Sequence, residues 1–491
     1  MGEVLMTMES LTGIHAYIEE QMKAWKVPGL SVAVVKNQEI VMMEGYGYRN
    51  IDKSLPVTSE TLFAIGSSTK AFTALAAGIL ADEKILKLDT PVKEYLPDFK
   101  MFDPFATERI TLRDMLCHRS GLPRHDLMWY NASLTREEII ERLRYLEPNV
   151  DFRTKWQYQN IMYMVAGYVV GHVSRSSWEE VVQKRIFRPL NMTSSQFSVD
   201  KTQLHHDYAM PYIQIEDQAR VIPFRNIDTI GPAGSINSNI KDMANWVRFQ
   251  INHGMHDGQR LVSNEMLDTL HTPHMVCEMT EVNENNTHMG SYGLGWLIEP
   301  YRGLRMVSHG GNIDGFTAHV AFIPAEKIGV VVLSNLNGTP LPVFISNYIF
   351  DSLLGGEVKD WSGLALGQKK EATVASEPTT NNEAAPGEKQ PIVPLSASLL
   401  DLAGTYVHAG YGEMVVELVD GGLRAGFNSM LFPLTHQNAN QFELHVTVFD
   451  IKTKATFLTD SNGSVDRLSV IMLFETGAKE IEFVRITSRT V

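Results

Sequence analysis

The chain has 491 residues, of which 44% are hydrophobic, and its formal net charge at pH 7 is -14. This length and composition are sufficient for a large buried core, and the acidic balance argues against nucleic acid or an anionic membrane surface as a partner. The start has no basic leader, and no apolar run reaches the length of a membrane-spanning helix, so we expect a cytoplasmic protein.

A helix and a hairpin are the first elements expected along the chain. Apolar residues recur at helical spacing between residues 9 and 25, namely Ile14, Ile18, Met22 and Trp25. The following segment, GLSVAVVKNQEIVMMEGYGYRN, predicts two strands joined by a turn at residues 36–38.

The next helical pattern covers residues 63–81, where a single apolar face contains Phe72, Leu75, Ala76, Ile79 and Leu80. Its polar start, GSST, places Ser67 at or just inside the helix N-terminus, and Lys70 follows one turn later beside it. Backbone N–H groups at a helix start stabilise developing negative charge, and an adjacent amine can take the proton of a hydroxyl. The pattern predicts a nucleophile, a base and half of an oxyanion hole; a capping serine beside a solvated lysine is the alternative.

A second pair of candidates, Tyr158 and Asn160, stands two apart just before an apolar run of helical character. A phenol at such a position can relay a proton to a leaving group. An amide there can hydrogen-bond a lysine or a substrate carbonyl.

The segment SHGGNIDGF supplies the third group of candidates. Gly310 and Gly311 allow a strand to approach a substrate closely, His309 adds a titratable ring, and Asn312 can supply a backbone N–H. A glycine-rich strand edge without a function is the alternative.

The remaining patterns divide the chain into three parts. Helices are expected at 136–146 and 177–186 and strands again within 305–338, which predicts one α/β (α+β) domain over residues 1–360. The polar segment 361–394 predicts a linker that few contacts cross. Short alternating runs in residues 395–491 predict an all-β module, either an antiparallel sheet or a small barrel.

The three motifs resemble those of the serine β-lactamase and penicillin-binding protein superfamily, in particular its class C-like branch of β-lactamases, D-amino acid peptidases and esterases. The resemblance covers roughly residues 10–355 and includes PGLSVAVV, LCHRSGLP, GPAGSINSNIKDMANW and YGLGW. It implies a β-lactamase/transpeptidase-like domain with an antiparallel sheet and helices, in which Ser67 is acylated. Lys70 would be the general base and Tyr158 the proton relay, two roles that are open to exchange. Asn160 would position these groups, and the backbone N–H groups of Ser67 and Asn312 would form the oxyanion hole.

One position departs from the family pattern, because His309 stands where the family has the lysine of Lys-Thr-Gly. That lysine helps to bind the carboxylate of β-lactams, whereas a histidine with an ordinary pKa near 6.5 is mostly neutral above pH 7.5. We therefore expect a poor β-lactamase, with a cephalosporin-to-ester activity ratio that rises as pH falls towards 6. For His118 and Trp296, in the accessory motifs, we expect structural roles.

The sequence thus predicts a serine hydrolase acting through an acyl-enzyme on small amides or short peptides, with D-amino acids favoured. A β-lactamase or carboxylesterase of the same mechanism and a non-catalytic penicillin-recognising or scaffold protein are the alternatives. The C-terminal module resembles the lipocalin-like barrel of some peptidases in this family, which implies that it either assembles a homo-oligomer or walls off the active site and so confines substrates to short peptides. No cofactor or metal is expected, since Cys117 and Cys277 stand far apart and His205 and His206 have no third ligand nearby.

Overall fold

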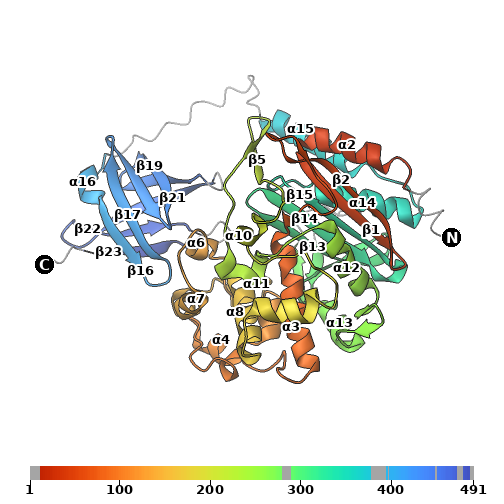
Figure 1. Ribbon diagram of the computed structural model, residues 1–491. Helices are drawn as coiled ribbons and strands as arrows, with labels where there is room; N and C mark the ends of the chain where they lie inside the picture. The colour runs from red at the N-terminus through yellow and green to blue at the C-terminus, as the bar shows by residue number, and fades with distance from the viewer. Residues whose placement is uncertain are drawn as a thin grey trace. The chain divides into compact units, whose positions relative to one another are not determined.

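A computed structural model describes residues 11–278, 289–376, 394–395, 397–447, 451–472 and 479–486. The chain forms two compact units (Figure 1). The first contains residues 1–97, 110–119 and 162–376, and the second contains 98–109, 120–161 and 377–491. The boundaries expected from the sequence, at 360 and 394, stay a prediction.

An antiparallel nine-stranded sheet forms the centre of the first unit, in the order β10-β11-β12-β13-β14-β15-β1-β2-β3. The strands are β1 (Gly29–Lys36), β2 (Glu39–Asn50), β3 (Leu55–Pro56), β10 (Met275–Glu278), β11 (Met289–Tyr292), β12 (Leu297–Tyr301), β13 (Leu304–Ile313), β14 (Phe316–Ile323) and β15 (Ile328–Ser334). The predicted hairpin is present, and Asn37 and Gln38 make its turn with positive φ. At the middle of the sheet, β1 pairs with β15 and so joins the two ends of the unit's sequence.

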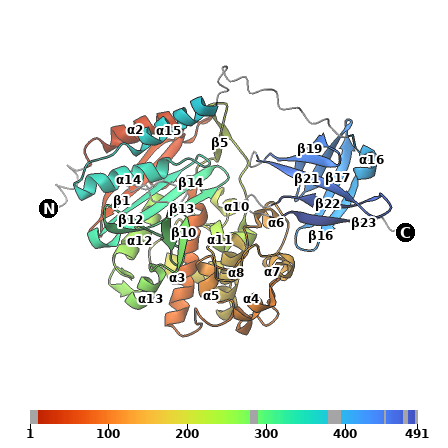
Figure 2. The same ribbon diagram turned by 180° about the vertical axis from the view of Figure 1, so that it is seen from behind.

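Helices cover both faces of this sheet, which explains why β1 and β15 are apolar and buried almost throughout (Figures 1 and 2). On one face, α2 (Ile14–Trp25) and α14 (Leu341–Leu354) share a hydrophobic core with the strands. On the other face lies α12 (Ile240–Ile251), which packs so closely that a Cβ added to Gly329 would meet Val247 at 2.0 Å. Helix α15 (Trp361–Ser376) covers the first part of the segment expected to be a linker, and Ser362 on it accepts a hydrogen bond from Trp25.

The helix predicted over 63–81 begins later than expected. Residues Phe63–Ala64 form strand β4, which pairs with β7 (Asn237–Ser238), and the single turn η1 (Gly66–Ser68) precedes α3 (Thr69–Asp82). Gly66 adopts φ +50, a conformation that does not continue a helix. The prediction that only one face of this helix is buried is also wrong, because α3 is buried on every side from Thr69 to Leu80. This helix lies in the interior of the unit rather than on its surface.

The other helices of the first unit are short apart from α8, whose first two residues belong to the second unit. They are α5 (Leu112–Leu116), α8 (Asn160–Val173), α9 (Trp178–Val182), α10 (Val199–Thr202), α11 (Gly231–Gly234) and α13 (Asn264–Leu270). The π-helix Gln183–Phe187 continues α9 and completes the helix expected at 177–186. No helix among the described residues is long and apolar enough to cross a membrane.

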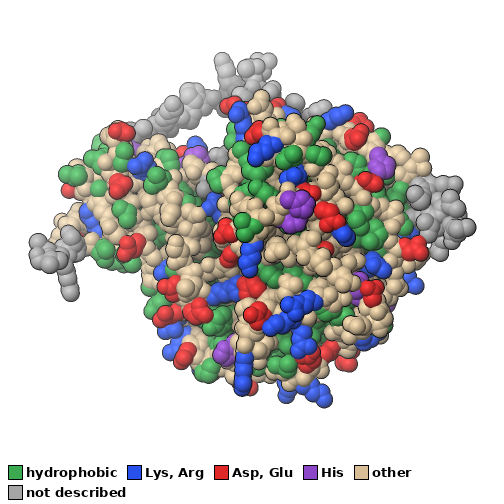
Figure 3. Space-filling model, viewed as in Figure 1, with side chains coloured by type: hydrophobic (Ala, Val, Ile, Leu, Met, Phe, Trp, Pro, Cys, Tyr) green, Lys and Arg blue, Asp and Glu red, His purple; other side chains and the backbone are tan. Residues whose placement is uncertain are grey.

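A closed barrel of eight antiparallel strands dominates the second unit, as the alternating C-terminal sequence predicted. Its strands are β16 (Gly404–His408), β17 (Gly412–Val419), β18 (Gly422–Phe427), β19 (Met430–Asn438), β20 (Gln441–Val446), β21 (Ile451–Thr459), β22 (Val465–Val470) and β23 (Ile481–Ile486). Pairing of β16 with β23 closes the barrel. The earlier segments of this unit contribute α4 (Pro104–Arg109), α6 (Asp126–Trp129) and α7 (Arg136–Arg142). Basic and acidic side chains are interspersed on the face shown in Figure 3.

Candidate active site

Ser67 is presented by the turn η1, between β4 and α3. Every residue from Thr61 to Leu80 is buried except Ser67, which is partly exposed. A short strand, a left-handed glycine and a buried helix therefore bring one hydroxyl to the surface at the start of α3. This is the exposure that a nucleophile needs.

Lys70 lies one turn further along and is completely buried. Its Nζ lies 3.1 Å from Oγ of Ser67 and donates to the carbonyl oxygen of Ala233, on α11, at 2.8 Å. The ring of Tyr163 lies below the amine, with 5.3 Å between Nζ and the ring centre. When neutral, this amine can accept the Ser67 proton over the same 3.1 Å contact.

Strand β13 meets the turn η1 backbone to backbone. A Cβ added to Gly311 would lie 1.8 Å from the carbonyl oxygen of Ile65 and 3.2 Å from the amide nitrogen of Ser67. A Cβ added to Gly66 would lie 2.7 Å from the amide nitrogen of Asn312. Only glycine permits this approach, which brings the amides of Ser67 and Asn312 into one small region.

His309, on the same strand, points away from solvent and is 3% exposed. Its Nδ1 lies 2.5 Å from the carbonyl oxygen of Gly310, which can only accept, so Nδ1 carries the proton. Its Nε2 then accepts the hydroxyl of Tyr292 at 2.9 Å. Burial, aided by the charge of Lys70, lowers the pKa of His309 to about 3. The expectation that this histidine titrates near pH 6.5 is therefore wrong, because its buried ring cannot easily take up a charge.

Three further rings, those of His118, Tyr163 and Tyr292, lie near these groups, and only His118 was singled out from the sequence, for a structural role. The ring of His118 lies 5.0 Å from that of Tyr163 and 4.8 Å from that of Tyr292. The hydroxyl of Tyr163 donates to the carbonyl oxygen of Leu116 at 2.5 Å. A chain of rings thus leads from beneath Lys70 to the hydrogen-bond partner of His309. The signal was present in LCHRSGLP and YGLGW, whose His118 and Tyr292 face each other only in the folded unit.

The rest of YGLGW contacts the core and the start of α3. A Cβ added to Gly295 would lie 2.9 Å from the Cα of Ala71, and Trp296 packs between Trp246 and Phe322 with ring centres 6.2 and 5.2 Å away. Trp296 is 1% exposed, in agreement with the structural role expected for it.

Tyr158 and Asn160 belong to the second unit, where each contacts a residue of the segment 121–131. The amide of Asn160 donates to Oδ1 of Asp126 at 3.0 Å, and the guanidinium of Arg124 lies 5.1 Å above the ring of Tyr158. The place of both residues beside Ser67 stays a prediction from the sequence motif.

Among the described residues, no group of three or more His, Cys, Asp or Glu side chains could hold a metal ion. Burial raises the pKa of both Cys117 and Cys277 to about 12, so both thiols stay protonated at neutral pH. The ring centres of His205 and His206 lie 4.5 Å apart, and this pair belongs to no such group of three in the part of the chain that the structure describes. A reaction without metal or cofactor stays a prediction.

Comparison with known proteins identifies relatives for both parts of the chain. The family model described as Beta-lactamase matches residues 14–352, and one described as a domain of unknown function (DUF3471) matches residues 388–485. Unguisins hydrolase ungD of Aspergillus violaceofuscus is 30% identical over an alignment of 452 residues, which covers 83% of this chain and 77% of that protein. Protein flp of Staphylococcus aureus is 27% identical over 354 residues, 70% of this chain and 66% of flp.

Two solved structures resemble this one over most of their length. The octameric penicillin-binding protein homologue from Pyrococcus abyssi has a TM-score of 0.63 and 26% identity, covering 97% of this chain and 100% of its own. A class C beta-lactamase, with a TM-score of 0.59 and 22% identity, covers 71% of this chain and 98% of its own and shares the fold.

Proposed function

Because the chain belongs to the beta-lactamase family, we propose that it is a serine hydrolase that acts through an acyl-enzyme on small amides or short peptides containing D-amino acids. The observation that carries this proposal is the 3.1 Å contact between the buried amine of Lys70 and the hydroxyl of Ser67. A solvated lysine would not be completely buried beside a serine that is the only exposed residue in its stretch of chain.

In the proposed reaction, Oγ of Ser67 attacks the substrate carbonyl while its proton passes to the neutral amine of Lys70. The backbone N–H groups of Ser67 and Asn312 stabilise the oxyanion that forms. The intermediate collapses and breaks the C–N bond, and the leaving amine receives a proton through Tyr158. Water then hydrolyses the acyl-enzyme and restores the Ser67 hydroxyl. Asn160 positions Tyr158, and Lys70 and Tyr158 can exchange roles in the first step.

The neutral His309 supports amides and esters over β-lactams as substrates. A charge-assisted hydrogen bond to a carboxylate contributes about 1.5 to 3 kcal/mol, so its absence lowers kcat/KM for carboxylate-bearing substrates roughly tenfold to a hundredfold. The relative named unguisins hydrolase, and the penicillin-binding protein homologue, support a hydrolytic role for this chain. The octameric homologue supports a homo-oligomer. A cytoplasmic location and the absence of nucleic-acid and membrane partners stay predictions.

The proposal is tested with Ser67→Ala and, as a matched control, Ser68→Ala, in which the neighbouring buried hydroxyl that donates to the carbonyl of His309 is removed. A fluorophosphonate or penicillin adduct should map to Ser67 by mass and be absent from Ser67→Ala. Values of kcat/KM are then compared for D- and L-aminoacyl p-nitroanilides, a p-nitrophenyl ester and a chromogenic cephalosporin. Faster cephalosporin or ester turnover would favour the β-lactamase or carboxylesterase alternative, and an adduct without turnover would favour a penicillin-recognising protein. An adduct on Ser68 would overturn the assignment.

A further inference from the structure

In the second unit, the Tyr158-x-Asn160 motif packs against the segment formed by residues 121–131. Each of the four residues 157–160 contacts this segment or its neighbour Asn149. The contacts are Gln157 Nε2 to Asn149 Oδ1 (2.6 Å), the Tyr158 ring below Arg124 (5.1 Å), Gln159 Nε2 to Pro123 O (2.5 Å) and Asn160 Nδ2 to Asp126 Oδ1 (3.0 Å). Asn149 in turn donates its backbone N–H to the carbonyl of Gly121. The positions of both motif side chains therefore depend on where this segment lies.

The barrel holds the same segment through the turn between β18 and β19. Asn428 in this turn donates from Nδ2 to the carbonyl oxygen of Leu127 in α6 at 2.8 Å and to that of Tyr130, which follows α6, at 3.3 Å. Asn131 returns a hydrogen bond from its own Nδ2 to the carbonyl oxygen of Asn428 at 2.7 Å. These partners are far apart in the sequence, and the bonds use backbone carbonyls that α6 itself leaves unsatisfied.

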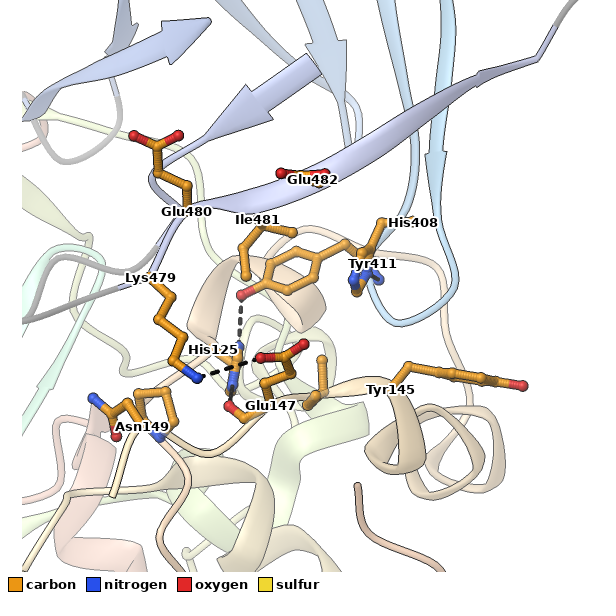
Figure 4. A pocket seen from close by; sticks show the side chains of 12 residues that line it. His125, Tyr145, Glu147, Asn149, His408, Tyr411, Lys479, Glu480, Ile481 and Glu482 are labelled. Atoms are coloured by element: carbon orange, nitrogen blue, oxygen red, sulfur yellow. Dashed lines mark hydrogen bonds and ion pairs between the residues drawn. The ribbon is translucent and has the colours of Figure 1, made fainter. Parts of the chain in front are cut away.

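A buried pair makes the second attachment (Figure 4). Nε2 of His125 faces the carbonyl oxygen of Glu147 at 3.3 Å and so carries the proton, which leaves Nδ1 to accept the hydroxyl of Tyr411 at 2.7 Å. Both side chains are 1% exposed. Burial lowers the pKa of His125 to about 4 and raises that of Tyr411, so both groups stay neutral at working pH and this bond persists. The ion pair between Glu147 and Lys479 in the same view is exposed and adds little.

From this arrangement we propose that the C-terminal barrel is a positioning element for the Tyr158-x-Asn160 motif, with Tyr411 and Asn428 as its positioning residues. The inference rests on the proposed function, in which Tyr158 delivers a proton to the leaving group. It also corrects the expectation that few contacts join the barrel to the preceding sequence. The composition of a linker says nothing about contacts that residues outside it make, and here the contacts are made by Asn428 and Tyr411 of the barrel.

Asn428→Gly is the decisive variant. Asn428 has φ +47, which glycine adopts without strain, so the turn is kept while both hydrogen bonds from Asn428 Nδ2, to Leu127 and Tyr130, are removed. Asp420→Gly is the matched control, since Asp420 has φ +49 in the two-residue turn at the other end of β18 and is exposed. Circular dichroism and thermal unfolding compare the folding of both variants with the parent.

The readout is kcat/KM for the p-nitroanilide and the p-nitrophenyl ester of one D-aminoacyl group. An anilide nitrogen needs a proton to leave, whereas p-nitrophenolate does not. Asn428→Gly should lower the anilide value about tenfold to a hundredfold, because small misplacements of a catalytic group cost this much, and should change the ester value less than threefold. Tyr158→Phe should give the same pattern, and adding Asn428→Gly to it should cost almost nothing more. Asp420→Gly should match the parent.

Three results would overturn the inference: parent-like anilide activity in Asn428→Gly, equal losses for anilide and ester, or losses that multiply in the double variant. If Asn428→Gly does not fold, Tyr411→Phe, which lacks only the hydroxyl bonded to His125, is held to the same criteria. Failure of the proposed function looks different, because the parent would then not be acylated at Ser67 or Tyr158→Phe would be fully active.

Discussion

Replacing Gly311 by alanine tests the contact between β13 and the turn that carries Ser67. The new Cβ would lie 1.8 Å from the carbonyl oxygen of Ile65. A normal carbon–oxygen contact is about 3.3 Å, so the two backbones would have to separate by about 1.5 Å. Both are packed in the interior, and such overpacking costs about 1 to 3 kcal/mol of stability. The separation also moves the amides of Ser67 and Asn312 apart, and loss of one oxyanion donor lowers kcat by about a hundredfold to a thousandfold.

The assay compares the rate of Ser67 labelling by a fluorophosphonate, kcat/KM for a p-nitrophenyl ester, and the unfolding temperature. Gly310→Ala adds the same methyl group one residue earlier, where the nearest heavy atom is the carbonyl oxygen of Ala318 at 3.8 Å, so its unfolding temperature should match the parent. Gly311→Ala with parent-like stability and labelling would refute the close approach of β13 to η1 and, with it, the oxyanion hole built on that approach.

Four further outcomes are expected. The cephalosporin-to-ester ratio should stay flat between pH 9 and 6, because the lowered pKa of His309 keeps its ring neutral; a rise towards pH 6 would show that it titrates there. The free energy of unfolding should fall between pH 6.5 and 4, because unfolding lets four buried histidines bind protons at their ordinary pKa, namely His125, His271, His309 and His319. Each of them lowers the free energy of unfolding by up to about 1.4 kcal/mol per pH unit. An unfolding temperature that is equal at pH 7 and pH 5 would contradict this. Removing residues 387–491 should lower kcat/KM for an anilide at least as much as Asn428→Gly does, since every barrel contact to α6 is lost. EDTA should leave turnover unchanged, and a loss restored by zinc would point to a metal.

Local sequence patterns predicted which helices and strands form, whereas contacts between distant parts of the chain determine the residues at which they begin. The hairpin β1–β2 and the helix α2 follow from apolar periodicity. The alternation after residue 395 predicted an antiparallel sheet or a small barrel, and the structure has the barrel. The start of α3 could not be read locally, because β4 is set by its pairing with β7 and the turn by the φ of Gly66. Periodicity cannot report a partner that lies elsewhere in the chain.

The same distinction holds for the candidate site. Ser67 and Lys70 are neighbours on one turn, so their spacing predicted the contact that the structure shows. The lowered pKa of His309 comes from burial and from the charge of Lys70, and neither is visible in SHGGNIDGF alone. For His118 the sequence predicted a structural role but not its ring partners Tyr163 and Tyr292, which are brought to it only by folding.

The pairing of β1 with β15 has a consequence for synthesis of the chain. Leu30 pairs with Ser334, so about 300 residues must leave the ribosome before the middle of the sheet can close. At about 5 to 20 residues per second this takes roughly 15 to 60 s. During that time the apolar strand β1 has only β2 as a partner in the sheet, and its other edge stays unpaired. The close approach of β13 to the turn that carries Ser67 also has to wait, so the proposed oxyanion hole is incomplete until most of the first unit has been translated.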